Sequence, residues 1–174
     1  MKYLATLPTI PSYLVQYVRT KCGTVTGLEG EYIDLSCMPL CQHLLRRSLV
    51  GFDSKETALH RWPEMASGVS VGIRLLEPKL KSTDPDIHFY MLGPSGASEI
   101  VSVLQSVFEM HLINEWTIRC SEYAKIMAVP SKSEFVKSFM EANGIEYEEK
   151  EFLTIYKRLD RILNKVSDNI AIKK

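Results

Sequence analysis

Residues 87–108 read IHFYMLGPSGASEIVSVLQSVF, and the chain changes character within this stretch. Before Gly93, two sets of side chains alternate as on the two faces of a strand. After Gly96, apolar residues follow the three- and four-residue spacing of an amphipathic helix. Seven of the eight prolines and seven of the nine glycines occur at or before Pro94. We therefore expect strands and turns before this point and helices after it.

The N-terminal half contains further strand patterns. The clearest covers residues 69–76, where Val69, Val71 and Ile73 recur at every second position. We expect shorter strands at 3–7 and 31–35, helices at 40–49 and 54–60, and an exposed loop at 77–86. Residues 13–21 fit either a helix or a strand. These patterns predict the α+β class, with a small, mainly antiparallel sheet in the N-terminal half and a helical C-terminal half that ends in a helix pair.

Three helices are expected after Gly96. The first runs to about Met127, with a strand over 112–119 as the alternative. The second follows Ser131, which has the capping-box spacing to Glu134, and the third spans 148–166. This last helix carries an apolar seam of Phe152, Ile155, Tyr156, Leu159, Ile162, Leu163 and Val166. The helix pair divides the chain into an α+β core at 1–129 and a segment at 130–174, either an appendage of that domain or a semi-independent unit.

Charge and composition narrow the class of protein. The 174 residues include 21 Lys and Arg, balanced by 21 Asp and Glu, which excludes a strongly basic protein that coats nucleic acid. A hydrophobic content of 45% excludes a wholly disordered chain. No apolar stretch approaches the roughly 18 residues of a membrane span. Pro8 interrupts the N-terminal apolar run, so we expect no secretory signal, a cytoplasmic location and no membrane contact.

The cysteines and histidines offer one weak metal pattern. Cys37 and Cys41 have the spacing of a zinc-binding pair and His43 is close by, but a second closely spaced pair is missing. Cys37 is also a candidate reactive thiol at a helix N-terminus, although no base can be assigned to it. Because free cysteine is among the most buried residue types, we favour a structural role and expect no metal or other cofactor.

The sequence contains no recognisable catalytic motif that would indicate an enzyme. The turn Gly93-Pro94-Ser95-Gly96 lies between a strand and a helix, but it lacks the lysine of a phosphate-binding loop. No histidine stands in an HExxH arrangement, and neither a nucleophile elbow nor a dinucleotide fingerprint occurs. An active site assembled from distant residues stays an open alternative.

The apolar seam of the last helix supports a role in protein binding. We predict a non-enzymatic accessory protein whose helix pair contacts a protein partner or a second copy of the chain. The predicted interface is Phe152, Ile155, Tyr156, Leu159, Ile162 and Leu163. The alternative is that these residues pack into the chain's own core.

Part of the helix pair carries a resemblance. The segments FMEANGI at 139–145 and FLTIYKRL at 152–159 resemble the helical tails of small phage and mobile-element accessory proteins. This resemblance covers less than a tenth of the chain, and it implies association with such an element.

Basic residues on the same helix suggest a second function. Lys157, Arg161 and Lys165 are spaced by four, so they lie on one helical face, where a phosphate backbone would offset their repulsion. The acidic start of the helix disfavours base reading. The alternative prediction is therefore weak, sequence-independent binding of nucleic acid. It would use Lys150, Lys157, Arg158, Arg161 and Lys165. A basic face that contacts only solvent is the other interpretation of this spacing.

Overall fold

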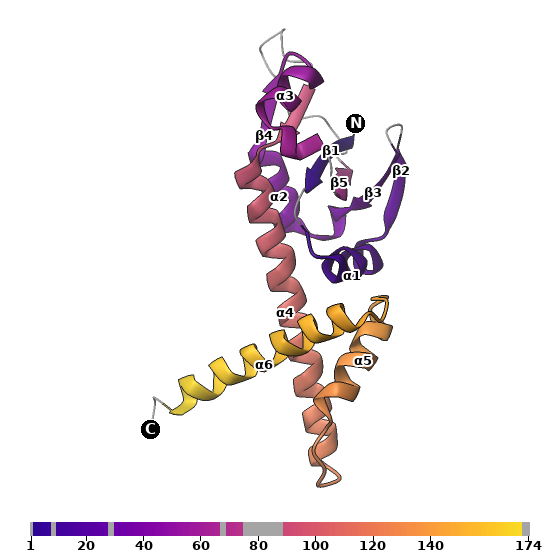
Figure 1. Cartoon of the computed structure of the whole chain (residues 1–174), viewed down its shortest axis with the longest axis vertical. Helices are drawn as coiled ribbons and strands as arrows, with labels where there is room; N and C mark the ends of the chain where they lie inside the picture. Colours follow the sequence, from indigo (N-terminus) through magenta and orange to yellow (C-terminus); the bar gives the residue numbers. More distant parts are fainter. Residues whose placement is uncertain (1, 8–9, 28–29, 67–68, 75–88, 172–174) are drawn as a thin grey trace. The chain divides into compact units, whose positions relative to one another are not determined.

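The computed structural model describes residues 2–7, 10–27, 30–66, 69–74 and 89–171 (Figure 1). The chain divides into two compact units, Met1–Gln105 and Ser106–Lys174, and helix α4 (Pro94–Ala124) contributes to both. The second half of α4 packs with the helix pair. The ring centroids of Phe108 and Phe139, for example, are 5.7 Å apart.

The first unit contains a four-stranded sheet with the order β1-β5-β3-β2. Its strands are β1 (Lys2–Leu7), β2 (Thr24–Gly27), β3 (Gly30–Asp34) and β5 (Val69–Arg74). The pairs β1–β5 and β2–β3 are antiparallel, and β3–β5 is parallel. Strands β4 (Leu49–Phe52) and β6 (Phe89–Leu92) form a separate antiparallel pair. The predicted α+β class with mainly antiparallel strand pairing is confirmed, although β4 was not expected.

The two expected helices of the first unit, at 40–49 and 54–60, are present, and a further helix and two 3-10 turns accompany them. They are α1 (Ser12–Cys22), the 3-10 turn η1 (Leu35–Cys37), α2 (Pro39–Ser48), α3 (Lys55–Arg61) and the 3-10 turn η2 (Pro63–Ala66). The ambiguous stretch at 13–21 is helical, because Tyr13, Leu14, Tyr17 and Val18 form one buried helical face. The loop expected at 77–86 lies outside the described residues.

The core of the first unit joins the sheet to its helices. Leu7 of β1, Tyr32 of β3 and Leu45 of α2 are almost completely buried, and Leu14 of α1 is buried with them. A polar contact adds specificity, since the side chain of Gln105 donates a hydrogen bond of 3.0 Å to the Tyr13 hydroxyl. This bond connects α1 to the first half of α4.

The second unit consists of the later part of α4, α5 (Lys132–Ala142) and α6 (Glu149–Ala171). Helix α4 runs without a break through Asn114, so the alternative strand at 112–119 is wrong. Leu112 and Trp116 are both buried four residues apart, which is the spacing of one helical face. Packing on that face outweighs the strand propensity of the individual residues.

The start of α5 matches the sequence prediction, and its end is followed by a glycine. The Ser131 hydroxyl accepts a hydrogen bond of 3.4 Å from the backbone N–H of Glu134, as an N-cap does. At the other end, Gly144 has a positive φ of 63°, which a residue without a side chain adopts at little cost. The short turn that follows allows α6 to pack back on α5.

Candidate functional site: the outer surface of α6

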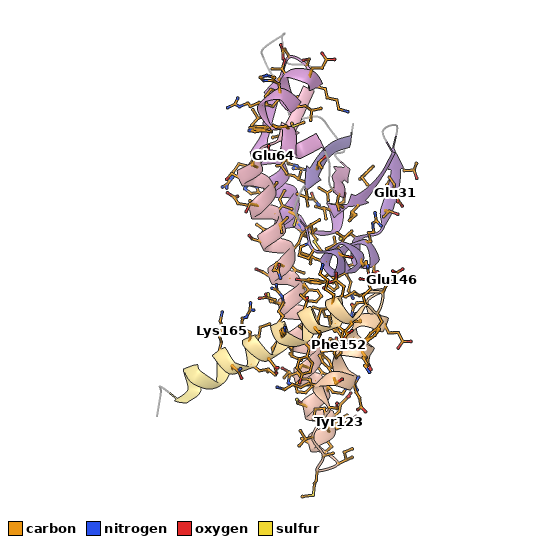
Figure 2. The ribbon with its side chains drawn as sticks, viewed as in Figure 1. Glu31, Glu64, Tyr123, Glu146, Phe152 and Lys165 are labelled. Carbon is orange, nitrogen blue, oxygen red and sulfur yellow. The ribbon has the colours of Figure 1, made fainter. Side chains whose placement is uncertain are left out.

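The predicted interface residues fall into two groups on α6. Ile155 and Leu159 are fully buried inside the second unit, whereas Phe152, Tyr156, Ile162 and Leu163 are half-buried. Figure 2 shows Phe152 near the beginning of α6, with Lys165 toward its other end. The side chain of Val166 lies outside the described residues. The seam therefore contributes to the unit's own core, and its half-buried members keep part of their surface accessible.

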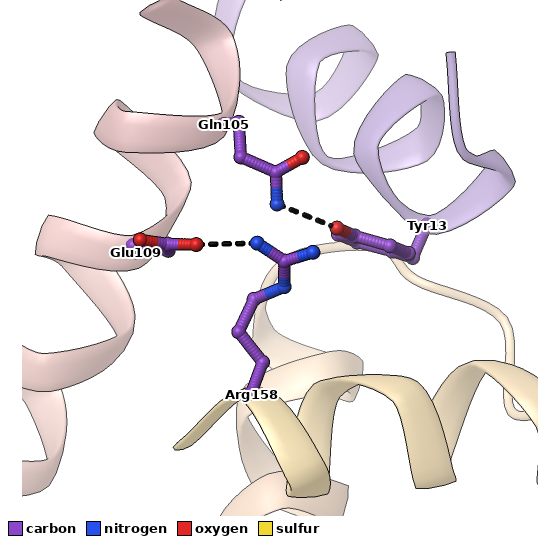
Figure 3. Close-up of polar contacts among 4 residues, drawn as sticks. All are labelled: Tyr13, Gln105, Glu109 and Arg158. Atoms are coloured by element: carbon purple, nitrogen blue, oxygen red, sulfur yellow. Dashed lines mark hydrogen bonds and ion pairs between the residues drawn. The ribbon is translucent and has the colours of Figure 1, made fainter. Parts of the chain in front are cut away.

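Ion pairs hold α6 against both of its neighbours. Arg158 pairs with Glu109 of α4 (Figure 3), and Asp160 pairs with Lys132 of α5. The hydrogen bond to Asp160 holds the pKa of the Lys132 ammonium above its usual 10.5. Both contacts agree with the rotation of α6 that buries Ile155 and Leu159.

Aromatic rings form a row at the junction of α5 and α6. The centroids of Tyr147 and Phe152 are 5.8 Å apart, and those of Phe152 and Tyr156 are 5.9 Å apart. Lys137 of α5 places its ammonium 5.9 Å from the Tyr147 ring and 6.0 Å from the Phe152 ring, within cation–π range. A pocket beside this row is lined by Lys137, Met140, Glu141, Ile145 and Tyr147.

Three cations lie in a row on the outer face of α6. Lys157, Arg161 and Lys165 are all exposed, and their four-residue spacing stacks them along the helix. Lys150 is also exposed. Arg158 was predicted to join this group, but its guanidinium pairs with Glu109 instead. We call Lys157, Arg161 and Lys165 the basic row.

Acidic residues occupy the other end of the helix. Glu146, Glu148 and Glu149 are exposed, while Glu151 is only 6% exposed. Their position suits the positive end of the helix dipole. The surface of α6 is thus negative at its start and positive along its later turns, where the half-buried Ile162 and Leu163 lie.

The candidate metal ligands differ in exposure. Cys37 and His43 are exposed and Cys41 is buried. Within the described ranges, no group of three or more His, Cys, Asp or Glu side chains is placed to hold a metal ion. The Sγ atom of Cys37 lies 2.9 Å from the Sγ atom of Cys22.

An exposed apolar tip between α4 and α5 escaped the sequence analysis. Ile126, Met127 and Val129 are 71%, 98% and 90% exposed, and Met127 has a positive φ of 55°. The expectation of a helix running to about Met127 concealed this tip. The sequence does contain a signal for this tip, which is the run of four apolar residues at 126–129 directly before Pro130. Consecutive apolar residues are unusual in a connection between helices.

Comparison of the chain with protein-family models, curated proteins and solved structures finds no match. Among the residues that the structure describes, no helix combines the length and the apolar character needed to cross a membrane.

Proposed function

We propose that this chain is a non-enzymatic accessory protein that binds another protein through the later turns of α6. The observation that carries the proposal is the combination of half-buried Ile162 and Leu163 with the exposed basic row beside them. Apolar surface supplies most of the affinity of such contacts, while charges at the edge select the partner and speed association. Association with phage or mobile-element proteins rests on the resemblance of 139–145 and 152–159 and stays a prediction.

The charge of this surface indicates the chemistry of the partner. A helix that carries an apolar stripe flanked by Asp and Glu would cover Ile162 and Leu163 and oppose Arg161 and Lys165. A second α6 bound through the same turns would bring two basic rows together, which costs free energy. An acidic amphipathic helix of a different protein is therefore the proposed occupant.

Binding of a designed peptide tests this proposal. The probe is a labelled amphipathic helix with an apolar stripe flanked by Glu, titrated with the full chain and followed by fluorescence anisotropy. We expect binding that weakens with added salt. The double variant Arg161→Glu, Lys165→Glu should reduce affinity by on the order of tenfold or more, because two attractions become repulsions. The matched control is Lys150→Glu, an exposed charge change on the same helix but away from Ile162.

Two peptide controls make the result decisive. A Lys-flanked version of the probe should not bind, and a scrambled version with the same composition should bind weakly because it lacks the stripe. Equal binding of all three peptides, or unchanged affinity in the double variant, would contradict the proposal. Sedimentation of the chain alone should show a monomer, and a dimer abolished by the double variant would replace the partner with a second copy.

The basic row also favours a second candidate function, which is nucleic-acid binding without sequence preference. Mixed-sequence duplex DNA should then bind with a slope of log K against log salt of about −3, one phosphate for each exposed cation. The triple variant Lys157→Gln, Arg161→Gln, Lys165→Gln should abolish this binding, whereas Lys150→Gln should weaken it only slightly. Retained affinity in the triple variant, or no binding at low salt, would eliminate this candidate.

A further inference from the structure

Two thiols meet at one point of the first unit. Cys22 is the last residue of α1, and Cys37 is the last residue of η1. Their Sγ atoms are 2.9 Å apart, although fifteen positions separate them in the sequence. Both are free cysteines. The distance is shorter than an ordinary sulfur contact, so a bond between the two atoms needs only a small movement.

The backbone between the two cysteines brings them together. Strands β2 and β3 form an antiparallel hairpin that starts two residues after Cys22 and ends three before Cys37, with Thr24 opposite Ile33. At the open end of the hairpin, the Asp34 N–H donates a hydrogen bond of 3.2 Å to the Gly23 carbonyl. The Asp34 carboxylate in turn accepts a bond of 3.1 Å from the Ser36 N–H, which caps η1. The pairing is thus a consequence of the fold.

The two thiols have different surroundings. Cys37 is exposed and Cys22 is only half-buried, so a small oxidant can reach Cys37 first. Burial and the neighbouring Cys37 raise the pKa of the Cys22 thiol well above its usual range, so Cys22 keeps its proton. Burial likewise raises the pKa of the Cys41 thiol to about 11, and Cys41 is inaccessible to solvent.

We propose that Cys22 and Cys37 form a peroxide-sensitive thiol pair that closes to an intramolecular disulfide. Cys37 loses its proton as its sulfur attacks hydrogen peroxide. An S–O bond forms, the O–O bond breaks, and the departing hydroxide takes that proton and leaves as water. The Cys22 sulfur then attacks the Cys37 sulfenic acid. An S–S bond forms, the S–O bond breaks, and the second water leaves with the Cys22 proton. The two thiols lose two electrons, and peroxide is reduced to water.

The disulfide would close the segment from Cys22 to Cys37 covalently around the β2–β3 hairpin. This inference concerns the first unit and is independent of the function proposed for α6. Its chemistry requires hydrogen peroxide as the oxidant and the close approach of the two thiols that the fold provides. The pair has a role that neither cysteine has alone. Without Cys22, the oxidation of Cys37 would end at the sulfenic acid or continue to higher oxidation states.

Thiol counting on the full chain tests the proposal. The reduced protein is treated with hydrogen peroxide, denatured, and alkylated, and the alkyl groups are counted by mass spectrometry. Accessible thiols should fall from four to two. Trypsin releases residues 22–46 as one peptide that contains Cys22, Cys37 and Cys41. This peptide should carry one alkyl group and should be two hydrogens lighter. Cleavage after Glu29 and Glu31 should leave its two halves joined until a reductant is added.

Variants identify the bonded pair. In Cys22→Ser, oxidation should stop at a Cys37 sulfenic acid that dimedone traps. If Cys22 had only a structural role, replacing it would not make this sulfenic acid accumulate. Cys120→Ser is the matched control and should form the same disulfide as the wild type. Because a variant at buried Cys41 can fail to fold, Cys41 is distinguished in the wild-type digest by chymotryptic cleavage after Leu40. Four alkylated thiols after oxidation, a bond to Cys41, or a disulfide-linked dimer would each overturn the proposal.

Discussion

Replacing Phe139 with alanine is expected to destabilise the second unit by about 3–5 kcal/mol, the usual cost of removing a buried aromatic ring. Phe139 is only 4% exposed, and its ring contacts rings from two helices. The centroid of the Phe139 ring lies 5.3 Å from that of His111 and 5.7 Å from that of Phe108, both on α4. It lies 5.9 Å from the ring centroid of Phe135 on α5. A cavity at this position removes contacts on every side, and the surrounding helices can fill it only in part.

Chemical denaturation followed by tryptophan fluorescence measures this loss. Of the two tryptophans, Trp116 lies in the second unit with its ring centroid 5.1 Å from that of Phe135, and Trp62 lies in the first unit. In a Trp62→Phe background, the signal reports on the second unit alone. The control Ser138→Ala changes the adjacent exposed residue on α5 and should alter stability by less than about 0.5 kcal/mol. A Phe139→Ala effect as small as this control would contradict the packing described above.

Replacing Gly96 with alanine should destabilise the first unit, although the same change ordinarily strengthens a helix by about 1 kcal/mol. A Cβ at Gly96 would lie 2.3 Å from the Ser48 Cβ and 2.9 Å from the Leu92 Cδ1. The Ser48 Cβ is attached directly to the end of α2 and cannot rotate away. Relief therefore requires the end of α2 and the start of α4 to separate, and overpacking of this kind costs about 1–3 kcal/mol.

A rescue variant separates this contact from other effects of the substitution. In the double variant Ser48→Gly, Gly96→Ala, the opposing Cβ is absent, so part of the lost stability should return. Ser98→Ala, an exposed change in the first turns of the same helix, should be neutral or slightly stabilising. The measurement is the thermal or denaturant midpoint from Trp62 fluorescence, in a Trp116→Phe background. Stabilisation by Gly96→Ala would show that α2 and α4 do not approach closely at this glycine.

Local signals of the sequence were sufficient for the caps and the helix faces. Ser54, at the start of the expected helix, accepts a hydrogen bond of 3.2 Å from the Thr57 N–H and caps α3. Ser131 precedes α5 where its capping-box spacing to Glu134 places it. These features depend on residues within one turn of each other, so they can be derived from sequence neighbours alone.

The structures of residues 49–52 and 112–119 could not be derived from sequence neighbours alone. Residues 49–52 carry little strand signal of their own, yet β4 forms because β6 provides a pairing edge for it, with Leu49 opposite Leu92. Conversely, Thr117 and Ile118 favour a strand locally, but they belong to α4 because Leu112 and Trp116 are buried on one helical face. In both cases a partner distant in sequence outweighs the local preference.

The sequence by itself determined the α+β class, the end of the strand-containing region before Pro94, and the amphipathic seam of α6. Each of these is a periodic pattern that any folded state must satisfy by burying its apolar face. Only the tertiary structure decided which seam residues are buried, that Arg158 pairs with Glu109 while the basic row faces outward, and that Cys22 meets Cys37. These outcomes depend on the rotation of a helix against its neighbours and on the register of a hairpin, which are set by contacts between residues far apart in the chain.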